Sequence, residues 1–148
     1  MIGILDYGCG NIKSLSNALH EINAQHKIIT NYKEIKKQDK IIIPGVGAYY
    51  SAIRKIKNLN FYKKILNFSS KKPILGICLG MQILSDFGEE FQLSEGLKLI
   101  NGKVEKIDEK KNISHVGWNS IILKKKEIYL KVLRIKQIFI LFMHINLI

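Results

Sequence analysis

Four short apolar runs, each ended by a turn, limit the folds open to this chain of 148 residues. The runs are MIGIL at 1–5, HKIIT at 26–30, KIII at 40–43 and KPILGI at 72–77. Segments with apolar residues at helical spacing separate most of them. Strands that are apolar on both faces and alternate with helices are typical of a parallel sheet covered by helices on both sides. The sequence therefore predicts an α/β fold.

The first predicted helix has both a cap and an apolar face. Asn11 is a residue type that accepts a hydrogen bond at a helix N-terminus. Apolar residues then recur three or four positions apart, at Ile12, Leu15, Leu19 and Ile22. We expect further helices over 48–57, around 61–67 and over 79–86.

Three turns contain glycine and follow the ends of predicted strands. They lie at 6–11, 44–47 and 76–80. Ligand sites on parallel sheets lie at the carboxyl ends of the strands. These turns are therefore where we expect the chemistry of the protein.

Cys78 lies in the third turn, within the sequence Gly-Ile-Cys-Leu-Gly at 76–80. This is the cysteine version of the strand-to-helix turn that exposes a catalytic serine, and small neighbours make room for it. A helix N-terminus stabilises a thiolate, and the N–H of the next residue can hold a developing oxyanion. The alternative is a small buried residue at a strand end. The pattern favours a nucleophile.

Cys9, the other cysteine, lies between two glycines in the first turn. A dinucleotide-binding loop would place a third glycine at position 13, where the chain has Lys13. We therefore interpret Cys9 as a turn residue. The two cysteines form neither a metal-ligand spacing nor a disulfide framework, so we expect no metal and no cofactor.

The net charge of +12 raises the possibility of nucleic-acid binding. The lysines are spread along the chain on the polar sides of amphipathic segments, without the interleaved aromatic residues on which bases stack. We predict a solvated lysine-rich surface and no nucleic-acid partner. With no apolar run near the length of a membrane span and no signal peptide, we expect a cytoplasmic protein without membrane association.

Five stretches of the sequence resemble one enzyme family. They are GILDYGCGNIKSL, IIIPGVGAY, PILGICLGMQIL, EGLKLINGKV and HVGWNSI, which lie in order between residues 2 and 121. Together they resemble the class I glutamine amidotransferases and, more narrowly, the glutaminase subunits of imidazole glycerol phosphate synthase. The resemblance implies a flavodoxin-like, mostly parallel sheet with helices on both faces.

The resemblance also implies roles for individual residues. Cys78 would attack the carboxamide of glutamine and form a glutamyl thioester. Gln82 and Glu90 match positions that hold the glutamine substrate in the family. The oxyanion hole would be formed by Gly45, Val46, Gly47 and the N–H of Leu79.

A second set of residues is implied to face a partner. In the family, the glutaminase forms a heterodimer with a barrel-shaped cyclase subunit, which uses the released ammonia in histidine biosynthesis. The residues that match this docking surface are Tyr7, Gly8, Asn11, His115, Trp118 and Asn119.

A general base is the part of the site that the sequence does not supply. The family provides it in a His-Pro-Glu stretch, because a thiol nucleophile needs a base that a carboxylate orients. His20 and His26 match nothing catalytic, and His115 belongs to the HVGWN segment. His144 is followed by neither proline nor an acidic residue. We therefore expect impaired glutaminase activity.

Residues 128–148 have an unusual composition, with no Gly, Pro, Ser, Thr, Asp or Glu. An amphipathic helix for a membrane or a partner is one interpretation, and a strand is another. A frameshift is the third, because back-translation read two bases later gives NIFKGIEDKADFYFVHAYKFN, which resembles the family. We favour the frameshift and expect an incomplete amidotransferase domain at 1–127, with its C-terminal strands missing, followed by an aberrant apolar tail at 128–148.

The predicted function is thus a glutaminase subunit of imidazole glycerol phosphate synthase. Two alternatives stay open at this stage. One is a paralogue that supplies ammonia for modified-sugar synthesis in surface polysaccharides. The other is a non-catalytic remnant that still binds the cyclase.

Overall fold

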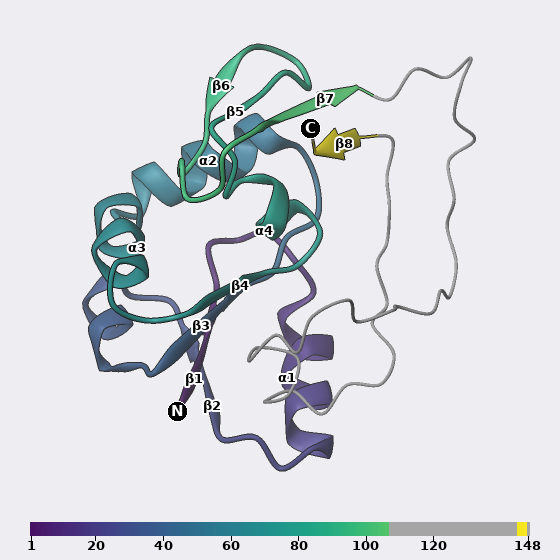
Figure 1. Cartoon of the computed structure of the whole chain (residues 1–148). Helices are drawn as coiled ribbons and strands as arrows, with labels where there is room; N and C mark the ends of the chain where they lie inside the picture. Colours follow the sequence, from purple (N-terminus) through teal and green to yellow (C-terminus); the bar gives the residue numbers. More distant parts are fainter. Residues whose placement is uncertain (107–144, 148) are drawn as a thin grey trace, which may run out of the picture.

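A four-stranded parallel sheet forms the centre of the molecule (Figure 1). The computed structural model describes residues 1–106 and 145–147. The strands are β1 (Ile2–Leu5), β2 (His26–Ile29), β3 (Lys40–Ile43) and β4 (Ile74–Gly76). They pair in the order β2-β1-β3-β4, and every pairing is parallel. The predicted parallel sheet is confirmed.

Helices cover both faces of this sheet, as predicted (Figure 1). On one face, Leu19 of α1 (Ile12–Glu21) packs with Ile4 and Ile42. On the other face, a larger apolar core joins the sheet to three helical segments. These are η1 (Tyr32–Lys37), α2 (Tyr49–Asn58) and α3 (Tyr62–Ser69).

The start of α1 follows the prediction, but its apolar face is shorter. The side chain of Asn11 accepts a hydrogen bond from the backbone N–H of Ser14 at 3.1 Å, which confirms the predicted cap. Ile22 lies at the C-cap and is 47% exposed. The chain turns away at Asn23, whose φ of +54° ends the helix before Ile22 reaches the core.

The helix after β4 is shorter than predicted. α4 spans only Leu79–Gln82, whereas the periodicity extended to residue 86. The carbonyls of Ile83, Leu84 and Ser85 accept hydrogen bonds from backbone N–H groups of residues 97–100. Because those acceptors are engaged by another segment, the helix does not continue.

A second, smaller sheet was not predicted. Its strands are β5 (Phe87–Gly88), β6 (Ser94–Glu95), β7 (Lys103–Lys106) and β8 (Ile145–Leu147), in the order β6-β5-β7-β8. β5 and β6 have only two residues each, which is too short to show an alternating pattern. β8 pairs antiparallel with β7, so three residues of the apolar tail form a strand. Within the described residues, no helix has the length and apolar character needed to cross a membrane.

Ile41 gives a test of the core, with Ile28 as its control in a neighbouring part of the same sheet. Ile41 is 1% exposed in β3, whereas Ile28 is 41% exposed in β2. We expect Ile41→Ala to lower the free energy of unfolding by about 2–5 kcal/mol, because it leaves a cavity. Ile28→Ala should cost about 1 kcal/mol or less. Urea unfolding measures both, and equal losses would contradict the core assigned here.

Candidate active site

The three glycine-containing turns meet at the carboxyl ends of the strands, as the sequence predicted. A β-carbon on Gly10 would lie 3.2 Å from the backbone nitrogen of Gly45. A β-carbon on Gly45 would lie 2.7 Å from the Tyr7 hydroxyl and 2.9 Å from the backbone nitrogen of Gly80. The turns at 6–11, 44–47 and 76–80 are therefore in direct contact.

Cys78 occupies a strained turn between β4 and α4. Its φ of +55° and ψ of −119° are unusual for any residue other than glycine. On its N-terminal side, the N–H of Ile77 donates to the carbonyl of Ile43 at 3.0 Å. On its C-terminal side, the N–H groups of Met81 and Gln82 donate to the Cys78 carbonyl at 2.8 and 3.1 Å. These bonds hold both flanks, and Cys78 itself is half-buried at the sheet edge.

The glycines that flank Cys78 are required by space. A β-carbon on Gly80 would overlap the carbonyl oxygen of Ile43. One on Gly76 would lie 2.5 Å from the α-carbon of Met81. The absence of side chains at these two positions lets α4 lie directly against the ends of β3 and β4. The predicted small neighbours of the cysteine are confirmed, and their role is close packing.

Tyr7 connects the first turn to the second. Its hydroxyl donates to the carbonyl of Pro44 at 2.8 Å. Burial raises the pKa of Tyr7 well above its ordinary value, and the nearby thiols of Cys9 and Cys78 raise it further. The hydroxyl therefore keeps its proton and remains a donor to Pro44.

This position corrects one sequence prediction. Tyr7 was expected on the partner surface, but its side chain is 1% exposed and belongs to the core. The apolar ring is buried under the 44–47 turn because the Pro44 carbonyl satisfies its hydroxyl. Gly8 and Asn11, from the same turn, are exposed as predicted.

The turn at 44–47 has a packed end and an open end. Gly45 is buried against Leu79, to which its β-carbon would approach within 2.9 Å. Val46 is 55% exposed. Gly47 has a φ of +107°, and a β-carbon there would meet nothing within 4 Å. Position 47 therefore requires glycine because of its positive φ, whereas position 45 requires glycine because neighbouring atoms leave no space for a side chain.

Glu90 lies beside this turn. Its Oε2 accepts a hydrogen bond of 2.6 Å from the backbone N–H of Tyr49, at the N-terminus of α2. The cap residue Ala48 has no side-chain oxygen for this purpose, so Glu90 supplies the missing acceptor from far along the chain. Gln82 lies at the end of α4, half-buried and one helical turn after Cys78. The two residues predicted to hold glutamine thus belong to the same edge of the sheet as Cys78.

Two residues of α2, Lys55 and Tyr49, make contacts that the sequence did not predict. Lys55 of α2 donates to the carbonyl of Gly8 at 2.6 Å and lies 3.4 Å from the Cys9 sulfur, so it fastens the first turn to α2. The buried hydroxyl of Tyr49 lies 3.1 Å from the Ser85 hydroxyl. Both residues are on α2, but no local pattern distinguishes them from neighbouring lysines and tyrosines.

Neither described histidine lies near Cys78. His26 begins β2, at the amino edge of the sheet, where its ring bonds to Ser16 and to the carbonyl of Ala24. His20 lies at the C-terminal end of α1, which returns the chain to that same amino edge. Over 1–106 and 145–147, no three His, Cys, Asp or Glu side chains are grouped to hold a metal ion.

Several predicted residues lie outside the part that the structure describes. They are His115, Trp118, Asn119 and His144.

Comparisons with known proteins point to one family. Residues 3–144 match glutamine amidotransferase class-I. The chain is 43% identical over 132 residues to "Imidazole glycerol phosphate synthase subunit HisH" of Caldanaerobacter subterraneus subsp. tengcongensis, which covers 88% of this chain and 65% of that relative. It is 42% identical over 134 residues to subunit HisH 1 of Campylobacter jejuni strain 81-176, which covers 87% and 67%. The chain therefore spans about two thirds of the length of these relatives.

Solved structures agree on the fold. A crystal structure of a glutamine amidotransferase has a TM-score of 0.66 at 14% identity, over 80% of this chain and 62% of that one. A putative peptidase E from Listeria monocytogenes EGD-e has a TM-score of 0.55 at 14% identity, over 67% of this chain and 62% of that one. At these identities the likeness concerns the fold alone.

Gly80 tests the close packing beneath Cys78. In an exposed helix, alanine is preferred to glycine, so Ala18→Gly in α1 should lower the free energy of unfolding by about 1 kcal/mol. At position 80 we expect the opposite preference, with glycine more stable than alanine, because the new methyl group would overlap the Ile43 carbonyl. We expect Gly80→Ala to cost about 2 kcal/mol or more. A stabilising Gly80→Ala in urea unfolding would contradict the packing.

Tyr7 yields a prediction about pH. Tyr7→Phe leaves the Pro44 carbonyl without its donor, so we expect a loss of about 1–2 kcal/mol near pH 8. Above pH 10, Tyr7 ionises in the unfolded chain but not in the folded one, which lowers the stability of the original protein as pH rises. Phenylalanine does not ionise, so the Tyr7→Phe variant does not undergo this loss. The difference in unfolding free energy between the original protein and the variant should therefore narrow between pH 10 and 11.

Tyr50→Phe is the matched control for this experiment. Tyr50 lies in the first turn of α2 and is 37% exposed. Its replacement should change the unfolding free energy by less than about 0.5 kcal/mol at either pH. A Tyr7 gap that is constant with pH would contradict the buried, protonated hydroxyl.

Proposed function

The chain belongs to the class I glutamine amidotransferase family, and from this premise we propose that Cys78 is the nucleophile of a glutaminase subunit of an imidazole glycerol phosphate synthase. The observation that carries the proposal is Cys78 at positive φ on a strand-to-helix turn. The similarity to HisH subunits favours this function over modified-sugar synthesis.

The proposed reaction begins at the thiol. The Cys78 sulfur bonds to the carboxamide carbon of glutamine, and the C–N bond breaks as the thiol proton passes to the departing ammonia. Water then attacks the resulting thioester, which releases glutamate and restores the thiol. Leu79 N–H and the 44–47 turn would stabilise the oxyanion of the tetrahedral intermediates. The support is that Gly45 lies against Leu79, while Val46 and Gly47 face open space that a substrate could use.

Glu90 and Gln82 would hold the substrate. In this proposal, the Glu90 carboxylate binds the α-ammonium group of glutamine while Oε2 keeps its bond to the Tyr49 N–H. The cap fixes the carboxylate beside the 44–47 turn before the substrate arrives. Gln82, one turn after Cys78, would add amide hydrogen bonds.

The partner surface would include the first turn. Gly8 and Asn11 are exposed there, and Lys55 holds the turn in place. In the proposal this surface docks the cyclase subunit, together with His115, Trp118 and Asn119. The protein would act in the cytoplasm, where the reducing environment keeps a thiol nucleophile active.

We propose that none of the histidines within these 148 residues acts as the general base. None of the four histidines is followed two residues later by glutamate, and His20 and His26 lie at the opposite edge of the sheet. General acid–base catalysis contributes about 10²–10⁴-fold, so turnover should be slower by at least that factor.

Covalent labelling tests the nucleophile without requiring turnover. A chloromethyl ketone analogue of glutamine should alkylate Cys78, since the thiol displaces chloride, and glutamine should slow the labelling. Mass spectrometry of the modified peptide identifies the cysteine. Cys9→Ser should leave the labelling rate unchanged, whereas Cys78→Ser should abolish it. Preferential labelling of Cys9, or no protection by glutamine, would refute the proposed site.

Chemical rescue tests the missing base. Without additives, glutamate release should equal that of Cys78→Ser within error. Added imidazole should raise the rate of the original chain but not that of the variant, because it can accept the thiol proton. A rate that depends on Cys78 before imidazole is added would show that the chain already contains a working base.

A further inference from the structure

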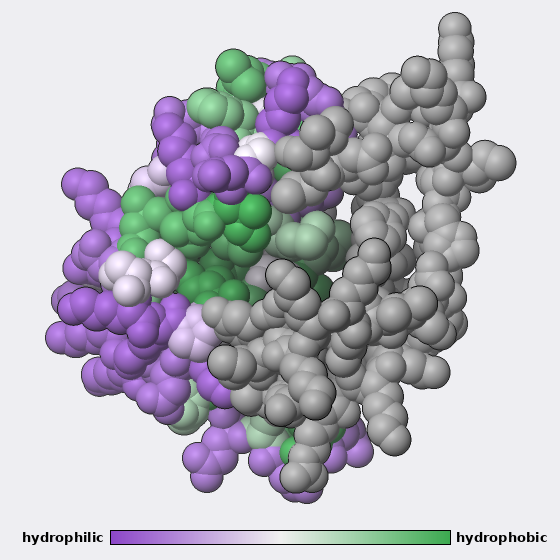
Figure 2. Space-filling view, in the orientation of Figure 1, coloured by the Kyte–Doolittle hydropathy of each residue, from purple (hydrophilic) through white to green (hydrophobic). Residues whose placement is uncertain are grey.

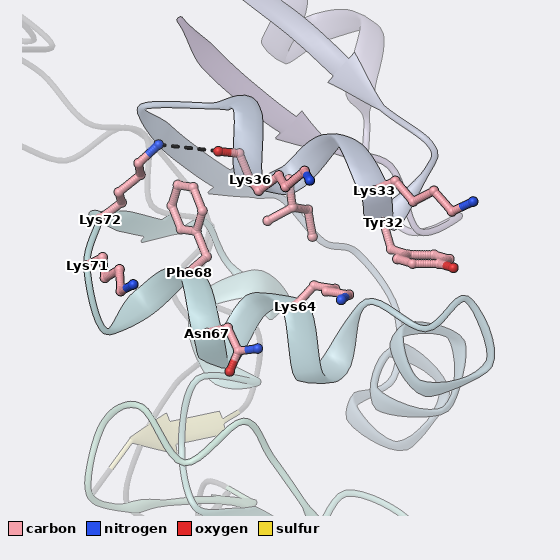
Figure 3. A pocket seen from close by; sticks show the side chains of 9 residues that line it. Tyr32, Lys33, Lys36, Lys64, Asn67, Phe68, Lys71 and Lys72 are labelled. Carbon is pink, nitrogen blue, oxygen red and sulfur yellow. Dashed lines mark hydrogen bonds between the residues drawn. The ribbon is translucent and has the colours of Figure 1, made fainter.

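A concave, lysine-rich pocket lies between η1 and α3 (Figure 3). Its volume is about 430 Å³, within the range of small-molecule sites. The lining residues are Tyr32, Lys33, Ile35, Lys36, Lys64, Asn67, Phe68, Lys71 and Lys72. None of them belongs to the three turns of the candidate active site. The pocket is therefore a separate feature, which the proposed glutaminase function does not use.

All the charged residues that line the pocket are positive. Five of its lining residues are lysines and none is acidic. The two acidic residues on the adjoining segment are engaged elsewhere. Glu34 pairs with Lys27 at 2.6 Å, and Asp39 pairs with the N-terminal amine. An anion in the pocket would therefore meet five lysines and no carboxylate within the lining itself, and Asp39, just outside it, acts electrostatically on Lys72 alone among these lysines.

Several of the lysines are positioned by the protein. Lys72 donates to the backbone carbonyls of Lys36 and Gln38, which joins the start of β4 to the end of η1 (Figure 3). Its ammonium also lies 5.5 Å from the centre of the Phe68 ring. Lys64 lies 5.8 Å from the centre of the Tyr32 ring. These contacts hold two ammonium groups, one from α3 and one from the segment that follows it, near aromatic rings of the pocket.

The pocket also contains apolar, aromatic and amide groups, which could contact the uncharged part of a ligand. Ile35 and Phe68 are nearly buried and form an apolar floor, and Tyr32 presents a half-exposed ring. Asn67 adds an amide donor and acceptor at the rim. Hydrophilic side chains gather along the left edge of the face in Figure 2, where Figure 1 places α3. The pocket thus combines a polar, cationic rim with apolar and aromatic surface.

We propose that this pocket binds a small phosphorylated molecule that carries a planar group, of the nucleoside diphosphate class. The lysines of η1 and α3 contact the phosphate oxygens, and the planar group lies against Tyr32 and Phe68. Lysine is a point-charge donor suited to phosphate, and aromatic faces stack on planar rings. A flat lysine-rich surface would offer the charge without the enclosed volume or the aromatic wall.

Two lysines next to the pocket provide a matched control. Lys36 and Lys64 line it, whereas their neighbours Lys37 and Lys63 are exposed on the same segments and do not. The double variants Lys36→Gln/Lys64→Gln and Lys37→Gln/Lys63→Gln remove the same net charge from the same helices. ADP binding to the full chain is measured by calorimetry at about 0.15 M salt, where the Debye length is about 8 Å.

We expect the pocket variant to weaken ADP binding about tenfold and the control variant to change it less than about twofold. Pyrophosphate should bind the original chain more weakly than ADP, because it lacks the planar group. Equal weakening in the two variants would assign the binding to general surface charge and overturn the proposal. Absence of saturable ADP binding would overturn it as well.

A measurement on the unaltered chain tests the location independently. In ¹H–¹⁵N NMR spectra, ADP should shift the amide signals of residues 32–36 and 64–72. Shifts spread over all lysine-rich segments, or centred on the turn at 76–80, would contradict the assignment.

Discussion

The close approach of α4 to the end of β3 is the constraint on which the candidate site depends. Gly80 allows it, because any side chain there would overlap the Ile43 carbonyl. That same carbonyl accepts the N–H of Ile77, so the residue before Cys78 and the helix after it are both held against one strand end. The chain changes direction at Cys78, which lies between these two fixed segments. Its positive φ is the strained backbone conformation that this change of direction requires. The position of Cys78 at the sheet edge therefore follows from backbone packing.

Polar contacts from distant segments then arrange the rest of the edge around this turn. The Tyr7 hydroxyl donates to the Pro44 carbonyl, and the Glu90 carboxylate caps the N-terminus of α2. The Lys55 ammonium of α2 donates to a carbonyl of the first turn. Each contact links segments that are more than 30 residues apart in the chain. The turn at 44–47 is consequently fixed at Gly45 and open at Val46 and Gly47. A site with one rigid side and one open side suits a substrate that must enter and then be held.

The sequence predicted those features that depend on residues close together in the chain. The apolar runs predicted β1 to β4, Asn11 predicted the cap of α1, and the glycines around Cys78 predicted a strand-to-helix turn. Features with non-local causes were missed. α4 ends early because the N–H groups of residues 97–100 donate to the carbonyls of residues 83–85, and the second sheet includes two strands of only two residues each. Tyr7 was placed on the surface because the family motif gave its position in a turn but not the direction of its ring.

We infer that packing beneath α4 forces Cys78 into its strained conformation at the sheet edge. A crystal structure of the chain, read for the backbone angles at this residue, tests it most directly. We predict a φ near +55° at Cys78, with the Ile77 N–H donating to the Ile43 carbonyl. An extended backbone at Cys78, with its sulfur enclosed in the core between sheet and helices, would contradict it.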